Sequence, residues 1–496
     1  MAEPGCPYAS RSARGVSAQA RHGSGASAAV RRHVASTSLA VLIAVLPLGC
    51  KKKEKQEPIN VPPPPGAASS DELTTAVGPA RGLSSTLAPT STRWKRVFVL
   101  DDKRAVVAGE TEDEAIALVT ENAGRTWRSL RRPRDGWSAW SVGADGSIVL
   151  AVGSRAPGRS KDADSAALPP AEEPINLFFA PSEAADLLAP SPVPLPELDR
   201  GATPPVDSVP AVLSAESAAL LISPKPRRAA LVHAGPPGAT PAPPVPLPPQ
   251  EQALPIPYGR PPALLSVRGR NLLTRPVPAP GKPLEAPRTV AGLVMTPAAT
   301  AALSASPACD FGEWSIQIVP QPPDKSAVVA ISAARTAVLK LPAKAAPLAT
   351  VGCGADRITV DVIAPTGGEP TLAACDLKGA CVLAEKQPFH PWIEPHERSV
   401  ASAPTREGVA AVLTARAAAR WGLYIALSPS PESGKLYEVP RVIGEGQGER
   451  GRIDLGALLS FGDRLLMLLQ ADVTGTSRRG WYVTVSEDSG LTWSPP

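Results

Sequence analysis

The chain has 496 residues, a net charge of +5, 43% apolar residues and 4% aromatic residues. Basic residues outnumber acidic ones mainly in the first 55 positions, and no basic stripe interleaved with aromatic residues follows, so nucleic-acid binding is not expected. The 60 Pro and 40 Gly favour many short strands over long helices, because Pro is tolerated at strand edges and in turns. The length suits two or three ordinary domains or one large domain built from repeats.

An apolar segment near the N-terminus predicts export. Residues 34–48 carry no charge and follow two arginines, a pattern typical of a secretory signal and too short for a stable membrane span. The segment ends in Leu-Pro-Leu-Gly-Cys at 46–50, which resembles the lipobox of bacterial lipoproteins, although that family prefers Leu where Pro47 stands. The resemblance implies cleavage before Cys50 and lipidation of its thiol. The alternative is a plain secretory signal, or a short anchor, with an incidental cysteine.

We therefore assign residues 1–49 to the signal region and expect the true start near residue 30, because thirty residues ahead of the basic segment are unusual for a bacterial signal. Residues 50–92 are Lys-rich and then rich in Pro, Gly, Ser and Ala, which predicts a flexible tether. The residue after Cys50 is Lys51, and not the Asp that holds some lipoproteins at the inner membrane. This favours anchoring in the outer membrane.

The first strands are expected after the tether, at 94–100, 104–109, 115–120 and 126–130, with turns at a spacing typical of an all-β sheet. The turn between the last two reads Thr-Glu-Asn-Ala-Gly-Arg-Thr-Trp, at residues 120–127. Two more strands, 137–143 and 147–153, begin the next sheet. In the middle of the chain, strands are expected at 175–180, 218–222, 229–232 and 263–267.

Those middle strands are separated by Pro-rich loops over about 155–300, and residues 158–174 look like an insertion. An alternative interpretation takes this stretch as a linker between two smaller β domains.

The end of the chain repeats the turn pattern as Ser-Glu-Asp-Ser-Gly-Leu-Thr-Trp at residues 486–493, after an expected strand at 481–485. Both strings resemble the Asp-box, or BNR repeat, of sialidase-like β-propellers. The resemblance assigns a structural role to ten residues: Thr120, Asn122, Gly124, Thr126, Trp127, Ser486, Asp488, Gly490, Thr492 and Trp493. Asp or Asn caps the turn, Gly adopts its backbone angles, and Trp packs beneath it. In that family the hairpin joins the third and fourth strands of a blade, away from the axial pocket, so it predicts fold better than activity.

Four cysteines follow the tether: Cys309, Cys353, Cys375 and Cys381. An even number in an exported protein predicts two disulfides, with three connectivities open. Cys375 and Cys381 fall where an Asp-box hairpin has Ser and Thr, so a disulfide could clamp that hairpin, which leaves Cys309 to pair with Cys353. The alternative is free buried thiols. The cysteines lack C-x₂-C zinc spacing.

The two Asp-boxes start 366 residues apart, and blades of about 50–60 residues then predict a β-propeller of about seven four-stranded blades over residues 93–496, with six to eight allowed. The chain ends before the last blade is complete, so its outer strand is expected from residues 75–92. Closing a ring in this way removes exposed sheet edges.

The same resemblance bears on function. Sialidases hold a sugar carboxylate with three arginines and use a Tyr–Glu pair and an Asp, but the early Arg-Ile-Pro motif that supplies one arginine is absent here. We therefore assign no catalytic residue, metal or cofactor, and expect a monomeric, non-catalytic envelope lipoprotein that binds a protein or glycan. The alternatives are an exo-sialidase-type glycoside hydrolase and an assembly factor for a membrane complex.

Overall fold

The structure is a computed structural model. It describes residues 87–134, 136–153, 175–193, 209–225, 228–305, 307–322, 325–341, 350–353, 357–362, 371–376, 381–383, 399–405, 409–417, 420–428, 436–438, 454–472, 479–490 and 493–494. The signal region, Cys50, most of the tether, the 158–174 insertion and Thr492 lie outside these residues.

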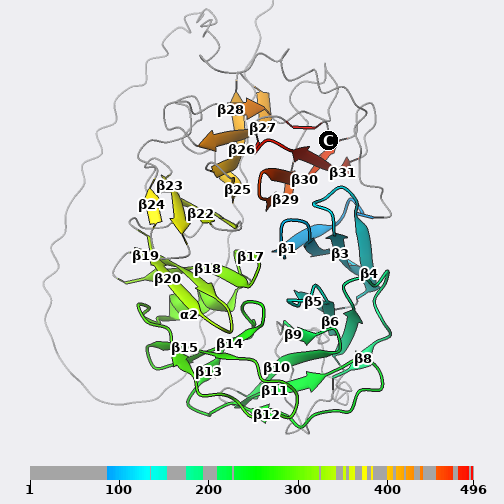
Figure 1. Cartoon of the computed structure of the whole chain (residues 1–496), viewed down its shortest axis with the longest axis vertical. Coiled ribbons are helices and arrows are strands. Elements are labelled where there is room, and N and C mark those ends of the chain that lie inside the picture. The colour runs from blue at the N-terminus through cyan, green and yellow to red at the C-terminus, as the bar shows by residue number, and fades with distance from the viewer. Residues whose placement is uncertain are drawn as a thin grey trace, which may run out of the picture. The chain divides into compact units, whose positions relative to one another are not determined.

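The described residues form an all-β fold of antiparallel sheets, in which successive strands of the chain are neighbours (Figure 1). We number the sheets in chain order. The first contains β1 (Arg93–Val99), β2 (Ala105–Glu110), β3 (Glu114–Thr120) and β4 (Arg128–Pro133). The second contains β5 (Trp137–Val142), β6 (Ile148–Gly153), β7 (Asn176–Ala180) and β8 (Ser191–Pro192). The third contains β9 (Ala211–Ser214), β10 (Ser217–Lys225), β11 (Arg228–Ala234) and β12 (Val245–Pro246). The fourth contains β13 (Gln252–Ala253), β14 (Ala263–Arg268), β15 (Asn271–Pro276) and β16 (Arg288–Thr289).

The second half of the chain continues this pattern after a short helix, α2 (Pro297–Ser304). The fifth sheet contains β17 (Cys309–Phe311), β18 (Trp314–Gln321), β19 (Lys325–Ile331) and β20 (Thr336–Lys340). The sixth contains β21 (Thr350–Cys353), β22 (Arg357–Val362), β23 (Thr371–Asp376) and β24 (Cys381–Leu383). The seventh contains β25 (Ser399–Pro404), β26 (Val409–Ala417), β27 (Arg420–Ser428) and β28 (Leu436–Glu438). The eighth contains β29 (Asp454–Phe461), β30 (Arg464–Asp472) and β31 (Arg479–Ser486).

The expected strands are confirmed to within a few residues, in the middle of the chain as well as at its start. Residues 209–289 form two sheets rather than a linker. In the part of the chain that the structure describes, no helix has the length and apolar character needed to cross a bilayer.

Burial explains the sequence pattern within a sheet. In the first sheet, β2 and β3 lie between other strands and are buried on both faces, so they read as nearly continuous apolar runs. The outer strand β4 instead buries Leu130 and leaves its other side chains half-buried or exposed, which is why it contains three arginines.

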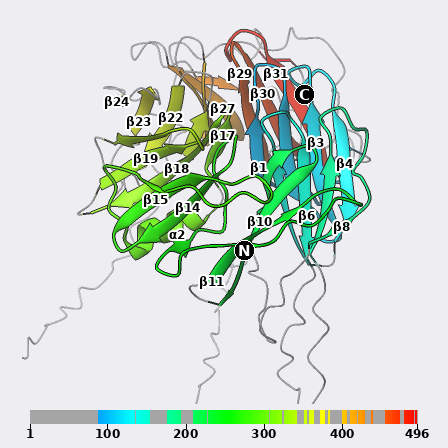
Figure 2. The same ribbon diagram turned by 60° about the horizontal axis from the view of Figure 1, so that its bottom comes forward.

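Consecutive sheets share hydrophobic cores. The first and second sheets bury Phe98 and Leu130 together with Trp140 and Leu150, and similar clusters join the second to the third, the third to the fourth, the fourth to the fifth and the fifth to the sixth. Further along, β21 contacts β25, and β25 contacts β29. The eighth sheet then packs on the first through a cluster that includes Trp481 and Val107, so that β29–β31 lie beside β1–β4 (Figure 2).

The first and fifth sheets also meet directly. β1 and β17 pair in parallel, with Phe98 opposite Asp310 and Val99 opposite Phe311, so the two sheets form one eight-stranded sheet. Figure 1 shows β1 and β17 meeting in the centre of the view. β1 and β17 are therefore the first strands of two sheets that lie far apart in the sequence, and they pair with each other in the middle of the fold.

Among the described residues the strands form eight successive groups, and the β1–β17 pairing joins two of them, so seven hydrogen-bonded sheets are present; the blade number of about seven, with six to eight allowed, stays a prediction. The two Asp-box strings follow the third strands of the first and eighth groups, so the 366 residues between their starts divide into seven intervals of about 52 residues, within the 50–60 assumed.

The eighth sheet has three described strands, and most of the segment expected to supply its outer strand, residues 75–86, lies outside the described residues. Ser494 pairs with the third strand, since its N–H donates to the carbonyl of Val485 at 2.7 Å. Residues 87–92, the described part of the segment expected to supply the outer strand, form turns against this sheet, where the Trp481 indole donates to the carbonyl of Pro89 at 3.1 Å.

A buried carboxylate anchors the fourth sheet. The side chain of Glu251 is fully buried and accepts hydrogen bonds from Ser266 at 2.7 Å and from the guanidinium groups of Arg268 and Arg275. Burial alone would raise the pKa of Glu251, but these hydrogen bonds and the charge of Arg275 outweigh burial and lower the pKa below its usual value.

Candidate functional site

The first Asp-box forms the turn between β3 and β4. The Thr120 hydroxyl accepts from the N–H of Gly124 at 2.8 Å, and the Asn122 side chain accepts from the N–H of Thr126 at 2.8 Å. Ala123 and Gly124 have φ of 54° and 79°, and a Cβ on Gly124 would collide with Leu466 of the eighth sheet. Trp127 packs at the edge of the core between the first and eighth sheets. Glycine is therefore required both by the turn and by the close approach of the neighbouring sheet.

The second Asp-box-like string, after β31, repeats the contact between the hydroxyl of its first residue and the N–H of its glycine. The Ser486 hydroxyl donates to the Asp488 carboxylate at 2.8 Å and accepts from the N–H of Gly490 at 2.7 Å. The indole N–H of Trp493 donates to the carbonyl of Gly490 at 2.9 Å beneath the turn. Both boxes follow the third strand of a sheet and use their polar groups within the turn, so they act as clamps rather than as a ligand site.

The cysteines are placed in neighbouring sheets. Cys309 on β17 and Cys353 on β21 form a disulfide with their Cα atoms 6.0 Å apart, as the sequence predicts. The strand register puts Cys375 of β23 directly opposite Cys381 of β24. That register fits the second predicted pair, whose side chains lie outside the described part of the structure.

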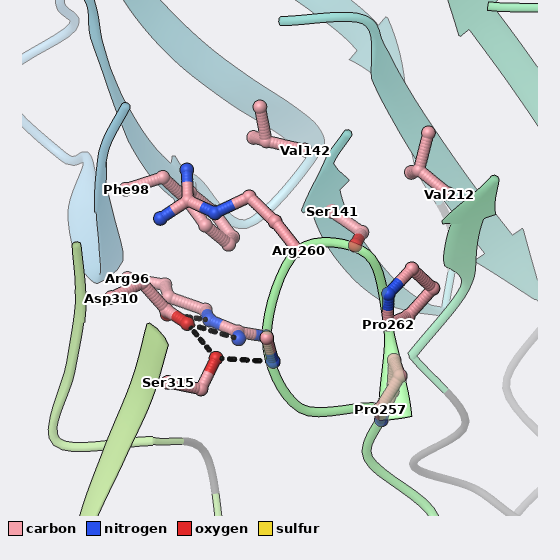
Figure 3. A pocket seen from close by; sticks show the side chains of 11 residues that line it. Arg96, Phe98, Ser141, Val142, Val212, Pro257, Arg260, Pro262, Asp310 and Ser315 are labelled. Atoms are coloured by element: carbon pink, nitrogen blue, oxygen red, sulfur yellow. Dashed lines mark hydrogen bonds and ion pairs between the residues drawn. The ribbon is translucent and has the colours of Figure 1, made fainter. Parts of the chain in front are cut away.

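Polar residues that the sequence analysis did not single out converge where β1 and β17 meet (Figure 3). They surround a cavity of about 10 Å³, with room for about one water molecule. Its wall includes residues from the first five sheets: Arg96, Phe98, Ser141, Val142, Val212, Pro257, Gly259, Arg260, Pro262, Asp310 and Ser315.

A buried ion pair closes one side of this cavity. Arg96 donates to Asp310 through Nε at 2.8 Å and through Nη2 at 3.2 Å, and its guanidinium lies 4.6 Å from the centre of the Phe98 ring. The Ser315 hydroxyl donates to the same carboxylate and accepts from the N–H of Gly259 at 2.9 Å. The pair thus links β1, the fifth sheet and the loop before β14.

Arg260 occupies the other side, on that same loop. It is 6% exposed, and its Nη2 donates to the carbonyl of Val99 at 3.2 Å. Burial lowers the pKa of Arg260 to about 10, while Asp310 opposes this effect, so the guanidinium is charged at neutral pH.

The cavity matches the sialidase constellation only in part. Two arginines and one aspartate line it, whereas the described lining contains neither a third arginine nor a glutamate. Tyr258, close by in sequence, donates its hydroxyl to the carbonyl of Leu303 at 2.6 Å, and burial raises the pKa of this phenol. A neutral, buried phenol bonded to backbone is poorly placed to act as a nucleophile. The described residues also lack any group of three or more His, Cys, Asp and Glu side chains that could hold a metal ion.

Sequence reasoning missed this cluster because its members stand in no recognisable motif. Arg96 and Asp310 are 214 residues apart, and Arg260 sits in an ordinary Pro-rich loop. A buried arginine in a strand-rich segment carries no sequence signal that separates it from an exposed one.

Comparison with known proteins gives distant structural similarity alone. No family model matches the chain, and no curated protein matches it. Among solved structures, it is similar to the β-propeller domain of the Trilobed protease from Pyrococcus furiosus, with 10% identity, 79% of this chain and 95% of that chain covered, and a TM-score of 0.30. It is also similar to a eukaryotic initiation factor, with 10% identity, 84% and 93% covered, and a TM-score of 0.34. A prolyl endopeptidase matches with 12% identity, 76% of this chain and 53% of that chain covered, and a TM-score of 0.33. Similarity this distant carries no information on activity.

Proposed function

We propose that this protein is an exported lipoprotein, anchored through Cys50 in the outer membrane, whose sheets form a closed, non-catalytic propeller of eight blades that binds an envelope protein. Two features of the sequence support the export and the anchor: the uncharged segment 34–48 and the lipobox-like string that ends at Cys50. The core that joins the eighth sheet to the first supports a closed ring.

The size of the axial cavity carries the non-catalytic part of the proposal. Pockets for small-molecule ligands enclose roughly 300–1,000 Å³, whereas this cavity has about 10 Å³ and is closed on one side by the Arg96–Asp310 pair. A sugar ring therefore does not fit where a sialidase would bind it. A partner must bind elsewhere on the surface.

A Pro-lined groove offers such a surface. It has a volume of about 440 Å³ and lies between β12 with its preceding residues and the 281–284 loop of the fourth sheet. Its lining is Pro243, Pro244, Val245, Pro246, Gly281, Lys282, Pro283 and Leu284. Glycan sites rely on aromatic faces and several polar groups, and this lining has no aromatic residue and one charged side chain. The groove therefore favours an extended, apolar protein segment over a glycan.

Lipidation is tested by producing the full-length chain in a Gram-negative bacterium with an alkyne-labelled fatty acid. The wild-type chain is expected to take up the label and to sediment with the outer membrane, and the Cys50→Ser variant to do neither. Equal labelling of both chains would refute the anchor.

Partner binding is tested by placing a photo-crosslinking amino acid at Lys282, with Arg270, an exposed residue in the β14–β15 turn of the same sheet, as the matched control position. A specific envelope protein is expected to crosslink from position 282, not from 270, and to be lost when Leu284→Glu adds a charge to the groove. Equal crosslinking from both positions, together with unchanged crosslinking in the Leu284→Glu variant, would refute this site.

The exo-sialidase alternative rests on Arg96, Arg260 and Asp310 meeting at the axis. It predicts hydrolysis of a fluorogenic sialoside that disappears in Arg96→Met, whereas the proposed function predicts no hydrolysis by either chain. The assembly-factor alternative uses the same groove and differs in its consequence, since deletion of the gene would then lower the amount of an assembled membrane complex.

A further inference from the structure

The guanidinium of Arg260 has no acidic side chain hydrogen-bonded to it among the described residues, and it shares the nearby charge of Asp310 with Arg96. Its Nη2 donates to the carbonyl of Val99, and its Nη1 is buried without a hydrogen-bond partner among the described residues. Unpaired polar atoms are rare in protein interiors, and an unpaired charge is costlier still. The side chain extends between Phe98 and Val142 (Figure 3), two apolar residues that offer it no acceptor.

The charges on the cavity wall do not cancel. Its ionisable groups are the guanidinium groups of Arg96 and Arg260 and the carboxylate of Asp310, which leaves one positive charge in excess. Asp310 cannot serve both arginines equally, because it already accepts two hydrogen bonds from Arg96 and one from Ser315. Since a buried cation is stable only when it is compensated, the missing partner should be an anion that does not belong to these side chains.

The size of the space restricts that anion to a single atom. A cavity of about 10 Å³ takes one water-sized particle, so a carboxylate, phosphate or sulfate is too large. Ser141 contributes a hydroxyl to the wall, and Phe98, Val142, Val212 and Pro257 supply apolar surface that limits hydration. A low dielectric strengthens the attraction between an enclosed anion and the guanidinium groups.

We propose that this cavity binds one monatomic anion, a halide such as chloride, which pairs with Arg260 and Arg96 and holds the first, second and fourth sheets together at the axis. The inference is independent of the partner and of the lipid anchor. The ion would have a structural role at the centre of the fold, and this cavity would not be a substrate site.

The test compares thermal unfolding of the purified full-length chain in sodium chloride and in sodium gluconate at equal ionic strength. Chloride is expected to raise Tm saturably, by about 2 °C or more, because it binds the folded state alone, whereas gluconate is too large to enter. Arg260→Met should abolish the difference. Arg270→Met, the same change at an exposed arginine of the fourth sheet, should leave it intact. Equal Tm values in the two salts for the unaltered chain would overturn the proposal.

A second measurement covers the case in which Arg260→Met fails to fold. Crystals of the unaltered chain soaked in bromide are expected to show an anomalous peak in the cavity, within hydrogen-bond distance of Arg260 Nη1. A cavity that holds no bromide, or that holds water alone, would overturn the proposal.

Discussion

Removal of the disulfide between Cys309 and Cys353 should destabilise the protein by an amount that follows from the length of the loop it closes. The two cysteines are 44 residues apart and join β17 to β21, the strands that begin the fifth and sixth sheets. In the chain-entropy model, a disulfide reduces the conformational entropy of the unfolded chain and so raises its free energy. For a loop of this length the effect stabilises the folded state by about 4 kcal/mol. We therefore expect the variant with both Cys309→Ala and Cys353→Ala to lose about 4 kcal/mol of unfolding free energy.

The assay is urea unfolding of the full-length chain under oxidising conditions, followed by tryptophan fluorescence. The matched control is Cys375→Ala with Cys381→Ala, because these cysteines face each other across neighbouring strands and would close a loop of only six residues. The same model gives about 2 kcal/mol for that loop. An unchanged midpoint in the first variant, or a larger loss in the control than in the first variant, would refute the reasoning.

Three further changes test the polar contacts of the fold. Asp310→Asn leaves the buried Arg96 without its counter-charge and is expected to cost about 3 kcal/mol in urea unfolding, whereas a neutral outcome would show that the pair contributes nothing. Ser486→Ala removes the acceptor of the Gly490 N–H and should cost about 1 kcal/mol and speed hydrogen exchange at that amide, while unchanged exchange would count against the clamp. Because the pKa of Glu251 is lowered in the folded state, its stabilising effect is fully present above the usual value of 4.5 and is lost as pH falls through the folded pKa. Glu251→Gln should therefore flatten the loss of stability below about pH 4.5, and an identical acid profile in the variant would contradict this assignment.

Local patterns predicted local structure well. Each Asp-box is readable because all its hydrogen bonds form within eight residues, as between Thr120 and Gly124, so the sequence alone contains the interaction. The Cys309–Cys353 disulfide was predictable because four cysteines leave few pairings once two of them are assigned to one hairpin. Strand ranges followed from short apolar runs bounded by turn residues, for the same reason.

Contacts between distant segments escaped prediction. The parallel pairing of β1 with β17 depends on how the intervening sheets bring residues near 98 and 310 together, and neither segment has a pattern that selects the other. Helix α2 was also not expected, although Thr296 followed by Pro297 is a recognisable start, with the Thr296 hydroxyl accepting from the N–H of Ala299 at 3.1 Å. The surrounding sequence is rich in Pro and Ala, and this composition led us to expect loops there and not a helix.

The polar centre has a consequence for where function can reside. A buried ion pair adds little net stability compared with apolar residues of similar volume, but it specifies which groups must meet. Arg96 of β1 and Asp310 of β17 belong to the two strands that pair in parallel, so their contact selects this pairing and its register over alternatives that would leave both charges buried alone. The same two side chains line the small central cavity and leave it about 10 Å³. If the protein binds a partner as proposed, the small central cavity directs that binding to the outer loops, where the Pro-lined groove beside β12 is the proposed surface.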